Sequence, residues 1–220
     1  MNTQQTPILY SLQNCPYAIR ARLALFKSQK KVLLRAIKLN NKPSEMLSAS
    51  AKGSVPILVI SQNLTIDESL DIMLWSLDKK DPNNLLHCNT LNARNNMLDL
   101  IKQFETHFIP ALSAYACAKR YHNVNLIECR ILCETVLQQL ETRLSQHTFL
   151  YSNNESLFDI AIVPFIRKFS KIERKWYQQS PYPNLRNWLN NYLQSTTFTK
   201  VMAKHELWID SGKQYYFPSP

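Results

Sequence analysis

A cysteine directly before a proline is the first feature of this chain that could do chemistry. The short apolar run Ile8–Tyr10 precedes the segment L-Q-N-C-P-Y-A-I-R, and the residues after this segment have a helical pattern. Pro16 suits the first turn of a helix, because the missing N–H costs nothing there. Cys15 would then lie at a helix N-terminus, where unpaired N–H groups and the positive end of the dipole stabilise a thiolate. We therefore expect a reactive thiol; the alternative is a buried, inert cysteine.

Two residue pairs further along the chain could serve the same chemistry. Pro56 follows Val55 at the start of an apolar run. If their peptide bond is cis, the main-chain N–H and C=O of Val55 could pair with an extended peptide. Glu68 and Ser69 open a helix-like segment, where Ser69 could hold a carboxylate and Glu68 an ammonium group; a simple helix cap is the alternative for this pair. With Cys15, they predict a site for a short thiol peptide with free amino and carboxyl groups.

The elements that would position these residues alternate along the first 80 residues. Apolar spacing and turn residues predict strands at 8–12, 31–39, 55–60 and 64–66, and helices at 15–28, 40–51 and 67–77. This β-α-β-α-β-β-α order predicts a mixed four-stranded sheet with helices packed against it.

The rest of the chain has a helical pattern. The polar stretch K-K-D-P-N-N at 79–84 is the best linker candidate. Beyond it, helices are predicted at 87–120, 124–146, 156–172, 183–194 and 196–204. We therefore predict an α/β domain at 1–79, a linker at 80–86 and an all-α helical bundle at 87–220.

Composition limits the classes of function. The net charge of +10 favours anionic partners, but no nucleic-acid motif accompanies it, so nucleic-acid binding is not expected. No apolar stretch approaches the roughly 20 residues needed to span a bilayer. The N-terminus has neither a basic nor an apolar signal region, which predicts a cytoplasmic protein.

The remaining cysteines do not indicate a disulfide framework or a metal site. Cys129 and Cys133 stand four residues apart, but no second Cys/His pair at ligand spacing accompanies them, so no metal is expected. We interpret Cys88, Cys117, Cys129 and Cys133 as small apolar residues in a reducing compartment.

Several motifs together resemble one known family. They are C-P-Y-A-I-R-A-R-L-A-L (15–25), L-N-N-K-P-S-E-M-L (39–47), K-G-S-V-P-I-L (52–58), I-D-E-S-L-D-I (66–72) and S-L-F-D-I-A-I-V-P-F (156–165). The chain is similar to cytosolic glutathione transferases of the cysteine-type branch, such as omega-class enzymes and dehydroascorbate reductases. This resemblance implies a thioredoxin-like first domain, a helical second domain and a homodimer. In the last motif it implies a helix-capping box between Ser156 and Asp159.

The resemblance also implies a role for each matching residue. Cys15 would be the catalytic thiol that forms a mixed disulfide with glutathione, the co-substrate, and Tyr17 would line the pocket beside it. Lys42 would meet the glycine carboxylate of glutathione. The Val55 main chain, before a cis Pro56, would bind its cysteine. The γ-glutamyl group would be bound by Glu68 and Ser69.

The type of nucleophile indicates the type of reaction. A cysteine here favours thiol transfer or reduction of a disulfide or small electrophile, whereas serine or tyrosine would activate glutathione for conjugation. Ala18 stands where a C-x-x-C motif has its second thiol, so a second glutathione must resolve the intermediate. Two alternatives stay open: a non-catalytic binding or adaptor protein of the same fold, and conjugation of glutathione to hydrophobic electrophiles.

The acceptor site would come from the helical domain. Phe104, Phe108 and Tyr115 recur at helical spacing, and Trp176 could close the cleft from another helix. An aromatic stripe at this spacing is also typical of the core of a helical bundle. His107 has no evident catalytic partner, and we interpret it as structural.

Overall fold

The computed structural model describes residues 6–87 and 90–219. The chain divides into two compact units, one made of residues up to Asn83 together with those from Ser195 onward, the other of Asn84–Gln194. Cys88, predicted to be an apolar filler, lies outside the described residues. Within the described ranges, none of the helices has the length and apolar character required to cross a membrane.

The first unit contains the α/β domain predicted from the sequence. Its elements up to Asn83 are β1 (Ile8–Ser11), α1 (Pro16–Ser28), β2 (Val32–Ala36), α2 (Ser44–Ala49), β3 (Ile57–Ser61), β4 (Leu64–Ile66) and α3 (Ser69–Leu77). β1 pairs in parallel with β2 and antiparallel with β3, and β3 pairs antiparallel with β4. The thioredoxin-like order of strands and helices is therefore confirmed.

The sheet has five strands instead of the four predicted. Its order is β4-β3-β1-β2-β5, and β5 (Tyr215–Phe217) pairs antiparallel with β2. The preceding elements α9 (Thr196–Val201) and α10 (Trp208–Ser211) lie in the same unit. The prediction of one all-helical domain from 87 to 220 is therefore wrong from Ser195 onward, because this segment belongs to the first unit and adds a strand at the β2 edge.

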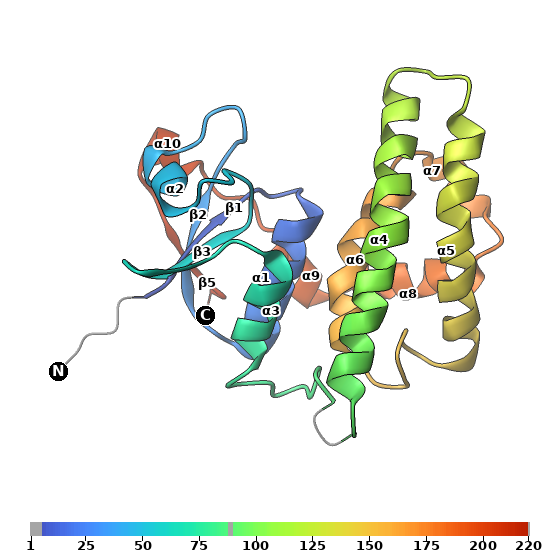
Figure 1. Ribbon diagram of the computed structural model, residues 1–220, viewed down its shortest axis with the longest axis horizontal. Coiled ribbons are helices and arrows are strands. Elements are labelled where there is room, and N and C mark those ends of the chain that lie inside the picture. The colour runs from blue at the N-terminus through green and yellow to red at the C-terminus, as the bar shows by residue number, and fades with distance from the viewer. Residues whose placement is uncertain (1–5, 88–89, 220) are drawn as a thin grey trace. The chain divides into compact units, whose positions relative to one another are not determined.

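Local chemistry explains how α1 presents Cys15. Pro16 occupies the first helical turn, and Cys15 is the N-cap residue with an extended backbone. The helix is buried along most of its length, and it lies beside α3 on one face of the sheet (Figure 1). It ends at Gln29, whose left-handed backbone lets its N–H reach the carbonyls of Leu25 and Phe26. Both ends of α1 are thus fixed.

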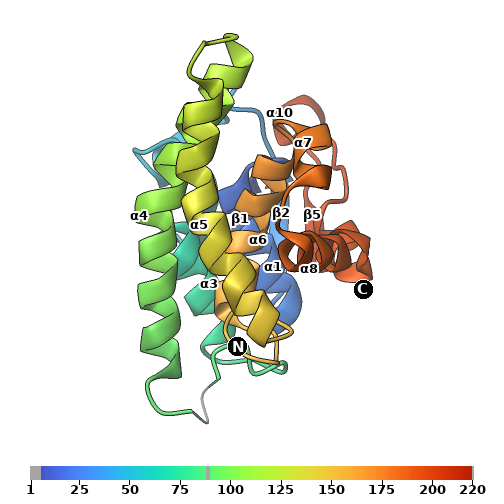
Figure 2. The same ribbon diagram turned by 90° about the vertical axis from the view of Figure 1, so that its right-hand side faces the viewer.

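The second unit is a helical bundle. It contains α4 (Ala93–Arg120), α5 (Leu126–Gln146), α6 (Leu157–Ser170), α7 (Arg174–Gln179) and α8 (Pro183–Gln194). The helices α4 and α5 lie side by side as a long antiparallel pair in both views (Figures 1 and 2). The short α7 was not predicted. Helix α6 is buried nearly all round and forms the centre of the bundle.

The predicted capping box at the start of α6 is confirmed. The Ser156 hydroxyl accepts from the Asp159 N–H, and the Asp159 carboxylate accepts from the Ser156 N–H at 3.0 Å. Asp159 also accepts from the Leu150 N–H at 2.8 Å and from the Trp188 indole at 3.1 Å. Burial raises the pKa of Asp159 to about 6, although these donors act to lower it. This carboxyl group therefore links α6, α8 and the loop before α6.

Candidate functional site

Cys15 lies where the end of β1 meets the start of α1. Its carbonyl accepts the Ile19 N–H at 2.9 Å, the first bond of the helix. The side chain is half-buried and packs against a cluster of apolar residues from β1, from α2, from the position after β2 and from the start of β3. The residue therefore combines a fixed backbone with partial access, as a reacting thiol requires.

The residue beside the thiol is Val55. The Cys15 Sγ lies 3.8 Å from the main-chain carbonyl oxygen of Val55, in position to donate its S–H. The Val55–Pro56 peptide bond is cis, as expected. The two segments are 40 residues apart in sequence. The structure therefore places the thiol beside the main-chain group predicted to bind a peptide.

Ser69 is the first residue of α3, and Glu68 is its N-cap residue. Ser69 is buried, and its hydroxyl accepts from Arg20 Nε at 2.9 Å. The guanidinium of Arg20 also lies 5.2 Å from the centre of the Tyr17 ring. Tyr17 and Ser69, both predicted site residues, are thus connected through an arginine that sequence reasoning did not select.

Glu68 already has a cationic partner. The Lys52 ammonium lies 2.5 Å from a Glu68 carboxylate oxygen and 3.2 Å from Asp67. Hydrogen bonds from Ser50 and Lys52 lower the pKa of Asp67 below its ordinary value, which keeps this carboxyl group ionised. The start of α3 therefore presents two adjacent carboxylates that attract an ammonium group.

Lys42 reaches the loop before Val55. Gly53 has a left-handed backbone with φ of +55°, and a Cβ atom there would lie 3.3 Å from the Lys42 Nζ. The absence of a side chain at Gly53 thus leaves room for this ammonium group. Lys42, Val55 and Lys52 are brought to one loop region of the first unit.

We did not predict a role for Arg22 from the sequence, although its side chain makes several hydrogen bonds in this unit. It is 3% exposed and donates to the loop before Cys15 and to the end of α9. The available signal was the stretch A-I-R-A-R-L-A-L, in which two arginines interrupt an apolar helix. Arginines within an apolar run indicate buried polar partners.

A pocket of about 580 Å³ adjoins this loop. Ser11, Leu12, Gln13 and Asn14 line one side, and Ala203–Leu207 line another. Lys38 also lines it. Burial, followed by the charge of Arg22, lowers the pKa of His205. The pocket is therefore built by the C-terminal segment and the loop that leads to Cys15.

The aromatic residues predicted to form an acceptor pocket pack together in the helical unit. Phe104 and Phe108 stack with ring centres 4.7 Å apart, and Tyr115 lies 5.4 Å from Phe169. Phe108 and Tyr115 are fully buried, so these two form core and do not line an accessible pocket. Trp176, half-buried, packs edge-on against Phe169. Of these predicted residues, only Phe104 lines a groove described next.

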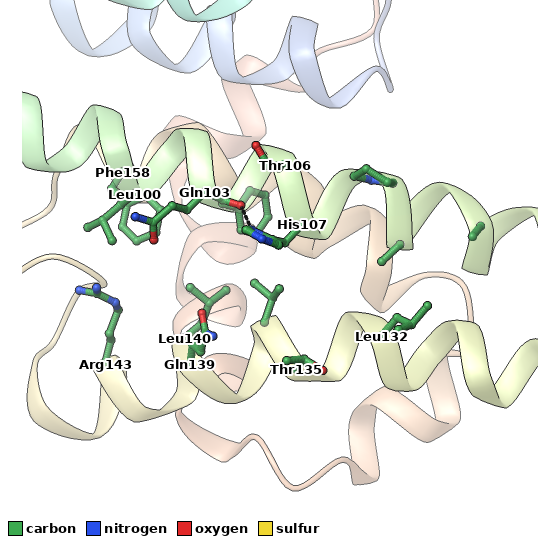
Figure 3. Close-up of a pocket in the computed structure, with 15 residues that line it drawn as sticks. Leu100, Gln103, Thr106, His107, Leu132, Thr135, Gln139, Leu140, Arg143 and Phe158 are labelled. Atoms are coloured by element: carbon green, nitrogen blue, oxygen red, sulfur yellow. Dashed lines mark hydrogen bonds between the residues drawn. The ribbon is translucent and has the colours of Figure 1, made fainter.

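The groove lies between α4 and α5 and has a volume of about 690 Å³ (Figure 3). Leu140 and Phe158 contribute apolar surface, and Gln103, Gln139 and Arg143 contribute polar groups. His107, which also lines it, bonds back to the Gln103 carbonyl within its own helix at 2.8 Å. The His107 side chain is exposed, and its structural role stays a prediction.

Comparison with known families identifies a domain in each unit of the chain. Residues 9–85 match the N-terminal domain of glutathione S-transferases, and residues 129–195 match the C-terminal domain. Together the two segments cover more than half of the chain. The chain belongs to the cytosolic glutathione transferase superfamily.

Solved structures agree with this assignment of the fold. A glutathione S-transferase-I bound with lactoylglutathione is similar, with TM-score 0.73 and 20% identity over 90% of this chain and 99% of its own. A Pseudomonas fluorescens family member with two glutathione molecules bound has TM-score 0.78 and 17% identity, covering 92% of this chain and 94% of its own. Glutathione transferase Omega 3C from Trametes versicolor has TM-score 0.77 and 17% identity, covering 94% and 88%. No curated protein sequence matches this chain.

Proposed function

We propose that this protein is a glutathione transferase that uses Cys15 as its nucleophile for glutathione-dependent thiol transfer or reduction. The observation that carries the proposal is the position of Cys15 at the N-cap of α1, with its sulfur 3.8 Å from the Val55 carbonyl. A thiolate at a helix N-terminus attacks disulfides well, and exchange needs no metal.

The reaction consists of two thiol–disulfide exchanges. The Cys15 thiolate attacks the glutathione sulfur of a glutathionylated substrate, which forms the Cys15–glutathione disulfide and releases the substrate as a thiolate. Free glutathione, as its thiolate, then attacks the glutathione sulfur of this intermediate, which yields oxidised glutathione and regenerates the Cys15 thiolate. In the net reaction, one free glutathione is consumed and forms oxidised glutathione with the glutathionyl group that the substrate carried, while the substrate leaves as a thiolate. Ala18 leaves no local thiol to replace this free glutathione.

The residues around the thiol would hold glutathione by its three parts. The main chain of Val55 would pair with the cysteine, and Lys42 would attract the glycine carboxylate. Glu68 and the N–H of Ser69 would take the γ-glutamyl group, whose ammonium matches the cation that Glu68 already attracts. Tyr17 would lie beside the reacting sulfurs.

The location and assembly are part of the proposal. We place the protein in the cytoplasm, where glutathione keeps thiols reduced, since Cys15, Cys117, Cys129 and Cys133 are all free. The homodimer expected from the sequence stays a prediction, which light scattering of the purified protein tests.

The test compares Cys15→Ala with Cys117→Ala in the reduction of a glutathione mixed disulfide. Cys117 is also free and is exposed on α4, so it is a matched control. We expect the first variant to lose thiol transfer and the second to keep it. In the parent protein, we also expect mass spectrometry to find glutathione attached to Cys15.

The same variants distinguish the alternatives. Conjugation of glutathione to a hydrophobic electrophile that persists in Cys15→Ala, without thiol transfer in the parent, indicates a conjugating enzyme. Glutathione binding without turnover of either kind indicates a binding or adaptor protein. Either outcome contradicts the proposal.

A further inference from the structure

The buried guanidinium of Arg22 joins two segments that are far apart in sequence. Its Nη2 donates to the Gln13 carbonyl at 2.7 Å, and its Nη1 donates to the Leu12 carbonyl at 3.2 Å. Its Nε donates to the Val201 carbonyl, at the end of α9, at 2.9 Å. One side chain therefore holds the loop between β1 and α1 and the C-terminal segment together.

The Leu12 carbonyl connects Arg22 to the main chain of Cys15. The Leu12 carbonyl oxygen that accepts from Arg22 also accepts the Cys15 N–H at 3.3 Å. The position of this oxygen fixes the N–H of Cys15, and with it the direction in which the side chain leaves the first turn of α1. Arg22 itself lies on α1, so the helix holds the loop that precedes it.

The loop and the C-terminal segment are also joined directly. The Gln13 side-chain amide donates to the Met202 carbonyl at 3.1 Å, and the Met202 sulfur lies 3.9 Å from the Arg22 Nη2. The Ser11 hydroxyl accepts from Arg22 Nη1 as well. The C-terminal segment is therefore bonded to the loop both directly, through Gln13, and through Arg22.

We infer that Arg22 is a positioning residue, which sets the reactivity of Cys15 by holding its loop between α1 and the C-terminal segment. The inference rests on the proposed function of Cys15, because a fixed loop matters only where that thiol reacts. Reacting atoms must be placed to within a fraction of an ångström, and displacement by about 1 Å can cost a hundredfold in rate.

Only arginine has the shape for this role. Three nitrogen atoms in one plane donate in fixed directions, whereas lysine has a single nitrogen on a flexible stem. A lysine at this position can satisfy one of the two segments and leaves buried carbonyls without a donor. We therefore expect Arg22→Lys to behave more like Arg22→Met than like the parent.

The test measures alkylation of Cys15 by iodoacetamide at neutral pH without glutathione, with each cysteine followed by peptide mass spectrometry. We expect Arg22→Met to slow alkylation of Cys15 by about tenfold and Arg22→Lys by nearly as much. In turnover, kcat should fall while the KM for glutathione changes less than about threefold, since the hydrogen bonds of Arg22 described above go to the loop before Cys15 and to the C-terminal segment.

Arg35→Met is the matched control. Arg35 also contacts the C-terminal segment, through Gln214 at 3.0 Å and the Trp208 ring at 3.9 Å, and it donates to the Tyr10 hydroxyl on β1 at 2.8 Å, whereas Arg22 donates to the loop itself. We expect it to lower stability with alkylation within about twofold of the parent. If Arg22→Met does not fold, Ser11→Ala removes one acceptor and should slow alkylation by about threefold.

The outcomes separate this inference from the proposed function. Unchanged or faster alkylation of Cys15 in a folded Arg22 variant overturns the inference, even if glutathione chemistry is intact. Slower alkylation in a protein that forms no glutathione disulfide supports the inference on Arg22 and overturns the proposed function instead.

Discussion

The thiol of Cys15 points to the main-chain carbonyl of Val55, with its sulfur 3.8 Å from that oxygen. A hydroxyl in the same place keeps a donor toward this carbonyl but loses the nucleophile that attacks disulfides. The residue type at position 15 therefore decides between thiol transfer and conjugation.

The first prediction concerns Cys15→Ser. We expect thiol transfer to fall by at least about a hundredfold, because serine is a poor nucleophile without an adjacent base. Conjugation to a hydrophobic electrophile should rise, since the hydroxyl can donate to the bound glutathione thiolate. Both rates are measured on one preparation, with Cys117→Ser as the control. Thiol transfer at the parental rate would contradict the role of Cys15.

The second prediction concerns Lys52, whose ammonium lies 2.5 Å from Glu68. If Glu68 binds the ammonium of glutathione, Lys52 competes with it for the same carboxylate. We expect Lys52→Met to tighten glutathione binding by about threefold, a size typical of an exposed ion pair, and less so at high salt. Calorimetric titration measures the affinity.

Lys213→Met is the control for this change. Lys213 pairs with Glu206 at 2.9 Å in the same unit, so the variant loses the same charge at another exposed pair. Its affinity for glutathione should stay that of the parent. Weaker binding in Lys52→Met would show that Lys52 assists the ligand instead of competing with it.

The third prediction compares the two glycines of the chain. Both have left-handed backbones, with φ of +55° at Gly53 and +65° at Gly212, so alanine at either should cost about 1 kcal/mol of stability. A Cβ at Gly53 would lie 3.3 Å from both the Lys42 Nζ and the Leu47 Cδ2, whereas none of the described atoms outside the chain neighbours of Gly212 lies within 4 Å of a Cβ there. We expect only Gly53→Ala to weaken glutathione binding, by several-fold in titration. Equal affinities would remove Lys42 from the proposed site.

Much of the first unit could be predicted because its information is local. Pro16 marks the start of α1, and the strand β4 at Leu64–Ile66 has the predicted bounds. The fifth strand could not be predicted in this way. Tyr215–Phe217 is three residues long, and it pairs with Val32–Leu34, far away in the sequence. The pattern of residues within a segment this short does not predict which distant strand it pairs with.

The same distinction holds for the candidate site. Cys15, Val55 and Ser69 belong to short motifs, so their types and neighbours indicated them. Arg20 and Arg22 act through side-chain bonds to residues 49 and 179 positions away, which the sequence does not display. The aromatic residues of α4 were ambiguous, because residues that form a core and residues that line a pocket recur at the same helical spacing. The structure places Phe108 and Tyr115 in the core.

The last prediction concerns the pH dependence of stability. Burial raises the pKa of Asp159 from its ordinary 3.8 to about 6 in the folded protein. Between these values the folded state binds more protons than the unfolded state, so stability falls as pH rises. Asp159 therefore contributes most below its unfolded pKa, and a shift of about two units corresponds to about 3 kcal/mol lost by neutral pH.

Asp159→Asn tests this sign, because the amide does not titrate. The variant should be less stable at acidic pH, since its NH₂ group cannot accept the Ser156 N–H that Asp159 Oδ2 accepts at 3.0 Å. As pH rises from about 4 to about 7, the difference in free energy of unfolding between parent and variant should shrink by about 2 kcal/mol, since part of the loss has already occurred at pH 4. Urea unfolding followed by circular dichroism measures it, with Asp210→Asn, at a residue exposed on α10, as the control. A difference that grows with pH would show that the four donors around Asp159 outweigh its burial.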